Sequence, residues 1–282
     1  MKTKSLIALF IIFLFMGFSV GDLKIIHNGK RLKSFNEMIA LLENVNVVFV
    51  GEQHTDPKAH FVELELLKKL YAKKRGKIIL SLEMFERDVQ SILNQYLEGK
   101  ISEEEFLKNS RPWKNYPTDY KPMIEFAKEK GIKVIASNVP RRYAAMVARN
   151  GLAVLNNLKP AERRLIAKTI YFDYPQYRKL FYKTMEAMGG PMGKHGAFKF
   201  KEKFYKAQCV KDSTMAESIY REMKKNPGFL ILHINGSFHS DYKLGTAGVL
   251  KTLFPEVKIA NVKVLPSDEE KLENKIADFI VY

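Results

Sequence analysis

Ionisable side chains stand directly after apolar, strand-like runs at several places in this chain. Residues 47–50 are apolar, Gly51 ends the run, and Glu52 and His54 follow at once. The pattern recurs after three further apolar runs, at 78–82, 134–137 and 229–232, and adds Glu83, Asn138, His233 and His239. Because the carboxyl ends of parallel strands meet at one edge of a sheet, we expect these side chains to gather there.

Carboxylate and imidazole groups in this number suit two kinds of chemistry. Together they bind Zn²⁺ or another divalent metal with a position left open for water. Without a metal, a Glu and a His can act as general base and acid, and Glu52 or Glu83 would then activate water. A third interpretation is a buried hydrogen-bond network that only holds the strand ends together. The set as a whole favours a functional site over that structural role.

A second group of residues lies far along the chain and is aromatic and cationic. Tyrosines and phenylalanines crowd between residues 171 and 205, among them Tyr174, Tyr177 and Tyr182, with Arg178 and His195 nearby. Helices need an apolar face, and that need explains most of these aromatics. A surface of aromatics with cations at its rim also suits a flat apolar ligand that bears carboxylates. Porphyrin is such a ligand, and a tyrosine phenolate can bind haem iron.

Two other reactive side chains are given structural or surface roles. His60 falls one turn into a helical stretch, and we predict that it is solvated. Cys209, the single cysteine, has flanks typical of the inside of a helix. It cannot form an internal disulfide, so we predict a buried, inert thiol rather than a nucleophile.

The elements that position these residues follow from periodicity and turn signals. A hairpin is predicted around Asn28 and Gly29. Strands are then predicted at 47–51, 77–83 and 133–137 and alternate with helices at 34–44, 57–74, 88–98 and 118–130. This alternation is typical of βαβ units with a parallel sheet.

Residues 141–226 interrupt the alternation. They carry helical patterns near 141–156, 160–168, 174–188 and 199–225, and strands return at 229–235, 257–264 and 276–281. The sequence therefore predicts an α/β fold with a mainly parallel sheet flanked by helices. We expect one domain, 22–282, with an all-helical insertion subdomain at about 141–226.

The N-terminus has the features of a signal peptide over residues 1–21. Lys2 and Lys4 precede an apolar stretch at 6–15, and small residues follow at 19–21. An uncleaved membrane anchor is the alternative, and no cysteine follows the stretch to serve as a lipobox. We expect an exported protein, either periplasmic or membrane-associated.

The formal charge of +16 predicts an anionic partner. Nucleic acid is not expected, because the basic residues fall at helix ends and loops and are not interleaved with stacking aromatics.

Five segments together resemble the ChaN-like haem-binding family of exported, iron-regulated bacterial proteins. They are Val-Gly-Glu-Gln-His-Thr at 50–55, Leu-Glu-Met-Phe-Glu-Arg at 82–87, Asn-Val-Pro-Arg at 138–141, the stretch 205–216 and His-Ile-Asn-Gly-Ser-Phe-His at 233–239. The resemblance covers residues from about 45 to 265. It implies haem or iron uptake, a parallel sheet with a small helical domain, and a homodimer that encloses two stacked haems.

The resemblance also implies how haem is held. A tyrosine of one subunit binds the iron, and a histidine of the other subunit lies at a propionate. Carried onto this chain, the histidine is best matched by His195, and Tyr177 is the first choice for the tyrosine. Tyr174 and Tyr182 stay open, and Arg178 is expected to favour the phenolate. A membrane or outer-membrane haem receptor is a further expected partner, although the missing lipobox cysteine departs from many members.

The strand-end segments are also similar to a wider superfamily that includes erythromycin esterases and Tiki-type metalloproteases. There the positions matched by Glu52, His54, Glu83 and His233 belong to a catalytic or metal site, and His239 is a further metal ligand candidate. The favoured hypothesis is a haem carrier without catalytic residues, and the alternative is a metal-dependent hydrolase. In either case we expect the insertion and the strand-end site to be separate.

Overall fold

The sheet is the centre of the molecule. The computed structural model describes residues 17–187, 196–266 and 275–282. Its eight strands have the order β2-β1-β8-β7-β3-β6-β4-β5. From β8 to β5 all neighbours are parallel, whereas the hairpin β1–β2 and its pairing with β8 are antiparallel. The predicted α/β fold with a mainly parallel sheet is confirmed.

The strands are β1 (Ile25–His27), β2 (Lys30–Arg31), β3 (Val47–Glu52), β4 (Ile78–Glu86), β5 (Lys133–Asn138), β6 (Leu230–Gly236), β7 (Ile259–Val264) and β8 (Phe279–Val281). The α-helices are α1 (Phe35–Leu42), α2 (Pro57–Lys73), α3 (Gln90–Leu97), α4 (Glu103–Ser110), α5 (Lys121–Lys130), α6 (Arg141–Asn150), α7 (Pro160–Arg163), α8 (Pro175–Ala187), α9 (Gly196–Lys225) and α10 (Gly245–Leu253).

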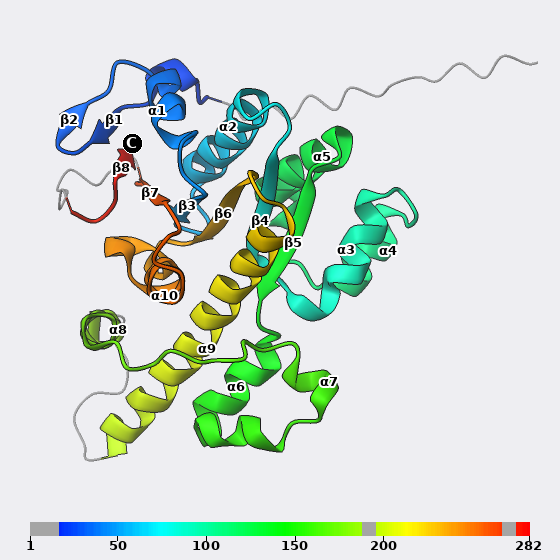
Figure 1. Cartoon of the computed structure of the whole chain (residues 1–282), viewed down its shortest axis with the longest axis vertical. Helices are drawn as coiled ribbons and strands as arrows, with labels where there is room; N and C mark the ends of the chain where they lie inside the picture. Colours follow the sequence, from blue (N-terminus) through cyan, green and yellow to red (C-terminus); the bar gives the residue numbers. More distant parts are fainter. Residues whose placement is uncertain (1–16, 188–195, 267–274) are drawn as a thin grey trace, which may run out of the picture.

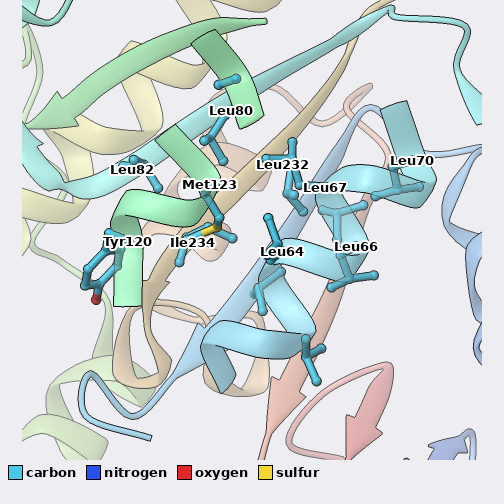
Figure 2. Close-up of a cluster of buried hydrophobic side chains, with 14 of the residues drawn as sticks. Leu64, Leu66, Leu67, Leu70, Leu80, Leu82, Tyr120, Met123, Leu232 and Ile234 are labelled. Carbon is cyan, nitrogen blue, oxygen red and sulfur yellow. The ribbon is translucent and has the colours of Figure 1, made fainter. Parts of the chain in front are cut away.

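Helices pack on both faces of the sheet because the central strands are apolar on both sides. On one face, leucines of α2 and Met123 of α5 pack against Leu80, Leu232 and Ile234 (Figure 2). On the other face, Ile219 of α9 and Leu250 of α10 belong to one buried cluster with strand residues of β3, β4 and β6. The result is a three-layer α/β/α arrangement in which the strand ends are flanked by both helix layers (Figure 1).

The segment between β5 and β6 contains no strand among its described residues. It holds α6 to α9, and the 30-residue α9 runs from the lower helices up to the sheet (Figure 1). Gly151, with φ +86°, ends α6, so the helix predicted at 141–156 is divided into α6 and a 3-10 helix. The helix predicted at 160–168 is a single turn, α7.

One helix was not predicted. In α4, the hydroxyl of Ser102 accepts a hydrogen bond from the amide of Glu105 and so caps the helix. A serine followed three residues later by a glutamate is a known start signal. It is easily missed here because α4 is short and mostly charged.

Within the described residues, no helix has the length and apolarity needed to cross a membrane. Residues 1–16, most of the predicted signal peptide, lie outside the description. Phe18 and Phe61 of α2 lie with their ring centroids 5.9 Å apart.

Candidate functional site

The carboxyl ends of β3, β4 and β6 do bring acidic residues and histidines together, but in two clusters. The Glu52 cluster consists of Glu52, His54, His60, Glu63, Asp119 and Tyr120. The Glu83 cluster consists of Glu83, His239, Asp212, Tyr177, Gln208 and Thr246.

Glu52, the last residue of β3, is buried and lies close to three neighbours through its two oxygens. Oε1 lies 2.7 Å from His54 Nδ1 and accepts a 2.5 Å hydrogen bond from the Tyr120 hydroxyl. Oε2 lies 3.3 Å from Nδ1 of His60. That same nitrogen lies 3.0 Å from Oε2 of Glu63. Glu52 therefore connects the exposed His54 to a fully buried histidine–carboxylate group.

The start of α2 places His60 and Glu63 inside the molecule. The side chain of Asp56 caps the helix by accepting from the amide of Lys58, and Pro57 takes the first helical position. Three residues apart on this helix, His60 and Glu63 share a face, and both are 0% exposed. The prediction that His60 is solvated is wrong, because this polar face of α2 packs against the end of β3.

The carboxyls of this cluster have unusual proton affinities. Burial, followed by the charge of Glu63, raises the pKa of Glu52 to about 8. Burial also raises the pKa of Glu63 to about 8. The neighbouring cations and hydrogen-bond donors are therefore too few to keep both carboxyls ionised at their ordinary pKa.

In the Glu83 cluster a histidine lies between two carboxylates. Nδ1 of His239 is 2.6 Å from Asp212 Oδ1, and its Nε2 is 3.2 Å from Glu83 Oε1. Burial alone would lower the pKa of His239, but attraction to Glu83 and Asp212 raises it to about 10. Burial alone would raise the pKa of Glu83, but the charge of His239 holds it well below its ordinary value. The pair is therefore an imidazolium and a carboxylate.

Gly236, the last residue of β6, lies where the two clusters approach each other. Its amide donates to Oε2 of Glu83 at 2.8 Å. A Cβ atom at this position would come within 2.8 Å of the ring of His54. Glycine is thus required for His54 to lie over the end of β6 and near Glu83.

His54 is the exposed member, with 44% of its side chain accessible. Its ring lies edge-on to Trp113 at 4.4 Å. Trp113 also lines a surface cavity of about 470 Å³, together with Met84, Glu86, Arg111, Pro112, Lys114, Arg141 and Arg142. With Nδ1 directed at Glu52, His54 has the geometry of a histidine oriented by a carboxylate for general acid–base chemistry. The hydrolase alternative stays a prediction.

Two of the predicted strand-end residues belong to neither cluster. His233 is in the middle of β6, 0% exposed, with Nδ1 2.8 Å from the Ser81 hydroxyl, and burial lowers its pKa to about 3. Asn138 donates to the backbone carbonyl of Glu83 and accepts from the amide of Val139. Asn138 therefore fixes the backbone at the ends of β4 and β5, and does not touch the carboxyl of Glu83.

The insertion residues differ in how accessible they are. Tyr177 of α8 is 1% exposed, and its hydroxyl donates to Asp212 Oδ2 at 2.8 Å. Burial and the charge of Asp212 raise its pKa well above the ordinary value. Tyr182 donates to Glu202 at 2.7 Å, and Arg178 lies 3.6 Å from the same carboxylate. Tyr174 is half-buried, and burial raises its pKa.

His195 lies outside the described residues. The expectation that the insertion would stand apart from the strand ends is wrong for Tyr177. Through Asp212 and His239, its hydroxyl is joined to Glu83 at the end of β4.

Several residues of these clusters were not expected from the sequence. They are the buried His60 and Glu63, together with Asp119, Tyr120 and Asp212. Asp212 lies within the stretch 205–216 that resembles the family, so that resemblance could have identified it as a candidate site residue. His60 and Glu63 have helical spacing, but a polar pair on a helix is more often solvated. Cys209 is buried, and burial raises its pKa, in line with an inert thiol.

Comparison with known proteins places this geometry in a wider context. The chain is 17% identical to a solved structure described as "Cofacial heme binding to ChaN of Campylobacter jejuni", with a TM-score of 0.70 over 92% of this chain and 96% of that one. An erythromycin esterase, EreC, in its open conformation is 14% identical, with a TM-score of 0.49 over 88% of this chain and 78% of that one.

Among curated proteins, the chloroplastic protein RETICULATA-RELATED 5 of Arabidopsis thaliana is 23% identical over 257 residues. The match covers 86% of this chain but 34% of that relative, so the chain spans about a third of its length. The ChaN structure supports the fold. The family model described as "Haem-binding uptake, Tiki superfamily, ChaN" matches residues 38–250. The chain therefore belongs to the haem-binding uptake family of the Tiki superfamily, as the strand-end and insertion segments predicted.

Proposed function

We propose that this protein binds haem at the helical insertion and acts in haem or iron uptake. Family membership and the cofacial haem binding of the Campylobacter jejuni ChaN protein support this proposal. The observation that carries it is the distribution of exposed aromatics. Among the described residues, the large exposed hydrophobics are Leu41, Phe172 and Phe204, and the latter two belong to the insertion.

Cations lie beside these aromatics, as a ligand with propionates requires. The ammonium of Lys206 lies 5.5 Å from the centre of the Phe172 ring. The guanidinium of Arg178, with 34% of its side chain exposed, lies 5.1 Å from the centre of the buried Tyr205 ring. Apolar rings with neighbouring cations match a porphyrin, which is flat and apolar with two carboxylates at one edge.

The tyrosine that binds iron is proposed to come from α8. Tyr177, the first choice from sequence, would have to lose its bond to Asp212, and its phenolate would then lie beside a buried carboxylate. Tyr182 is a better-placed ligand. If its hydroxyl leaves Glu202 to bind iron, that carboxylate still has Arg178 and Lys206 as partners. We therefore place Tyr182 first, with Tyr177 and Tyr174 as the alternatives.

Phenylalanine substitutions test this order, because they keep the ring and remove only the ligand atom. Haem added to Tyr182→Phe should give a visible spectrum without the phenolate-to-iron charge-transfer band, and affinity should fall at least about tenfold. Tyr205→Phe is the matched control, since Tyr205 is a buried tyrosine of α9 whose hydroxyl donates to a backbone carbonyl. If Tyr182→Phe, Tyr177→Phe and Tyr174→Phe all keep the wild-type spectrum, ligation by a tyrosine of α8 is wrong.

Export remains part of the proposal. A haem-uptake protein of this kind would act in the periplasm or at a membrane, where a haem receptor could exchange ligand with it. The basic and apolar N-terminal segment supports export. The N-terminal residue of protein recovered from the extracytoplasmic fraction checks it, with Asp22 as the expected first residue.

A further inference from the structure

His60 is surrounded by more acceptors than it has protons. Its Nδ1 lies 3.0 Å from Glu63 Oε2 and 3.3 Å from Glu52 Oε2. Its Nε2 lies 3.1 Å from the carbonyl oxygen of His54 and 3.3 Å from Asp119 Oδ2. An imidazole can donate at most one hydrogen bond from each nitrogen, so at least two of these four oxygens receive no proton from the ring.

The carboxylates around His60 are also short of donors. Glu52 and Glu63 are each about 1% exposed or less, and Asp119 has 14% of its side chain exposed. Glu52 Oε2 and Glu63 Oε1 are buried and accept no hydrogen bond from the described residues. Unpaired carboxylate oxygens in a buried position are costly, and either a proton or a metal cation at this point relieves that cost.

The geometry around Nδ1 fits a bound metal ion. The side-chain ligand atoms of Glu52, His60 and Glu63 all lie within 4.8 Å of one another. Ligands held at about 2.1 Å from a divalent ion are about 3.0 Å apart in octahedral and about 3.4 Å apart in tetrahedral coordination. The distances of 3.0 and 3.3 Å from Nδ1 to the two carboxylate oxygens match these values.

We propose that Glu52, His60 and Glu63 bind a divalent metal ion through Glu52 Oε2, His60 Nδ1 and an oxygen of Glu63. In this arrangement Nε2–H of His60 is free to donate to the carbonyl of His54 and to Asp119. A ligating histidine in metalloproteins ordinarily donates its other N–H to a carbonyl or carboxylate in this way. All four oxygens around His60 are then accounted for.

The ligand set defines the chemical class of the ion. One imidazole and two carboxylates suit Zn²⁺, Mn²⁺ or Fe²⁺, and the absence of thiolates in the set disfavours Cu⁺. This site differs from the predicted one, which combined Glu52 and His54 with Glu83 and His239. Each ring nitrogen of His239 already faces a carboxylate, Asp212 at Nδ1 and Glu83 at Nε2, so neither nitrogen is directed at the Glu52 cluster.

The proposal is independent of haem binding and is tested on the full chain without haem. The protein is stripped with a chelator, dialysed and titrated with Co²⁺, whose visible absorption reports its coordination, and with Zn²⁺ by calorimetry. We expect one equivalent of each to bind. In Glu63→Gln and His60→Gln, affinity should fall at least about a hundredfold. Glu65→Gln is the matched control on the same helix, because Glu65 pairs with Lys68 at the surface.

A second variant keeps the test valid if those two fail to fold. Asp119→Asn leaves the three proposed ligands in place and changes the group that faces Nε2 of His60, which also accepts a hydrogen bond from Asn115. It should weaken Co²⁺ binding about 10- to 100-fold while the circular dichroism spectrum stays that of the wild type. If the stripped wild-type chain binds neither Co²⁺ nor Zn²⁺, or if Glu63→Gln folds and binds both as tightly, the proposal is overturned.

Discussion

Two carboxylates hold the buried imidazole ring of His239 in place. Its ring lies between Glu83 and Asp212, and Asp212 also accepts from the hydroxyls of Thr246 and Tyr177. The hydroxyls of Thr246 and Tyr177 thus stabilise the carboxylate of Asp212, which in turn faces His239. Such pairs contribute little net stability compared with apolar packing, but removing one partner is strongly destabilising.

His239→Gln should therefore lower the free energy of unfolding by about 3–5 kcal/mol near pH 6, because two buried carboxylates lose their cation. The pKa of His239 is raised from 6.5 to about 10, so its stabilisation is complete below pH 6.5 and is lost as the pH rises toward 10. The difference between wild type and variant should shrink over that range. Urea unfolding at a series of pH values measures it.

His27→Gln is the control, since His27 lies in the hairpin with Nδ1 2.9 Å from a backbone carbonyl. Its profile should run parallel to that of the wild type. A constant gap between His239→Gln and wild type from pH 6 to 10 would contradict the assigned charge.

At the scale of elements, the end of β6 determines where His54 lies. Gly236 has an ordinary extended backbone, φ −55° and ψ 134°, so alanine is allowed there conformationally. Its side chain would nevertheless come within 2.7 Å of His54 Cε1. His54 is half-exposed and can swing outward, so the structure can relieve the clash by losing the contact with Trp113.

Gly236→Ala should consequently cost only about 1 kcal/mol of stability but change the fluorescence of Trp113, the chain's single tryptophan. Emission should change because the imidazole of His54 no longer lies edge-on to the indole. His54→Ala serves as the reference and should give the same spectrum. An unchanged emission in Gly236→Ala, with a changed one in His54→Ala, would show that the clash is relieved elsewhere.

The elements also show what could be predicted from the sequence. Apolar runs with β-branched residues located β3, β4, β5 and β6, and polar residues after them located the edge of the sheet where the candidate site lies. Periodicity could not reveal that α2 buries His60 and Glu63, because the inward face of a helix is normally recognised by apolar residues. Nor could it show that Tyr177 bonds to Asp212, since that contact depends on how α8 packs against α9.

For the whole molecule, haem loading should be accompanied by dimerisation. Phe172 and Phe204 are 38% and 36% exposed beside α8 and α9, and a stacked pair of haems would bury this region. Sedimentation velocity should show a monomer without haem and a dimer with it. Phe172→Asn should raise the dissociation constant of the dimer about tenfold.

Leu41→Asn is the matched control, because Leu41 is equally exposed on α1. It should leave the dimer unchanged. A loaded protein that remains monomeric at all concentrations would rule out the shared site, although haem could still bind to each chain separately.

The strand order has a consequence for how the nascent chain behaves. β3 and β4 follow one another in the sequence, yet β6 lies between them in the sheet, and β3 has β7 on its other side. The central strand β3 therefore has no neighbour until residues 230–236 leave the ribosome. Pairing between such distant segments is slow. β4 and β5 can pair earlier, but the centre of the sheet cannot form until most of the chain has been made.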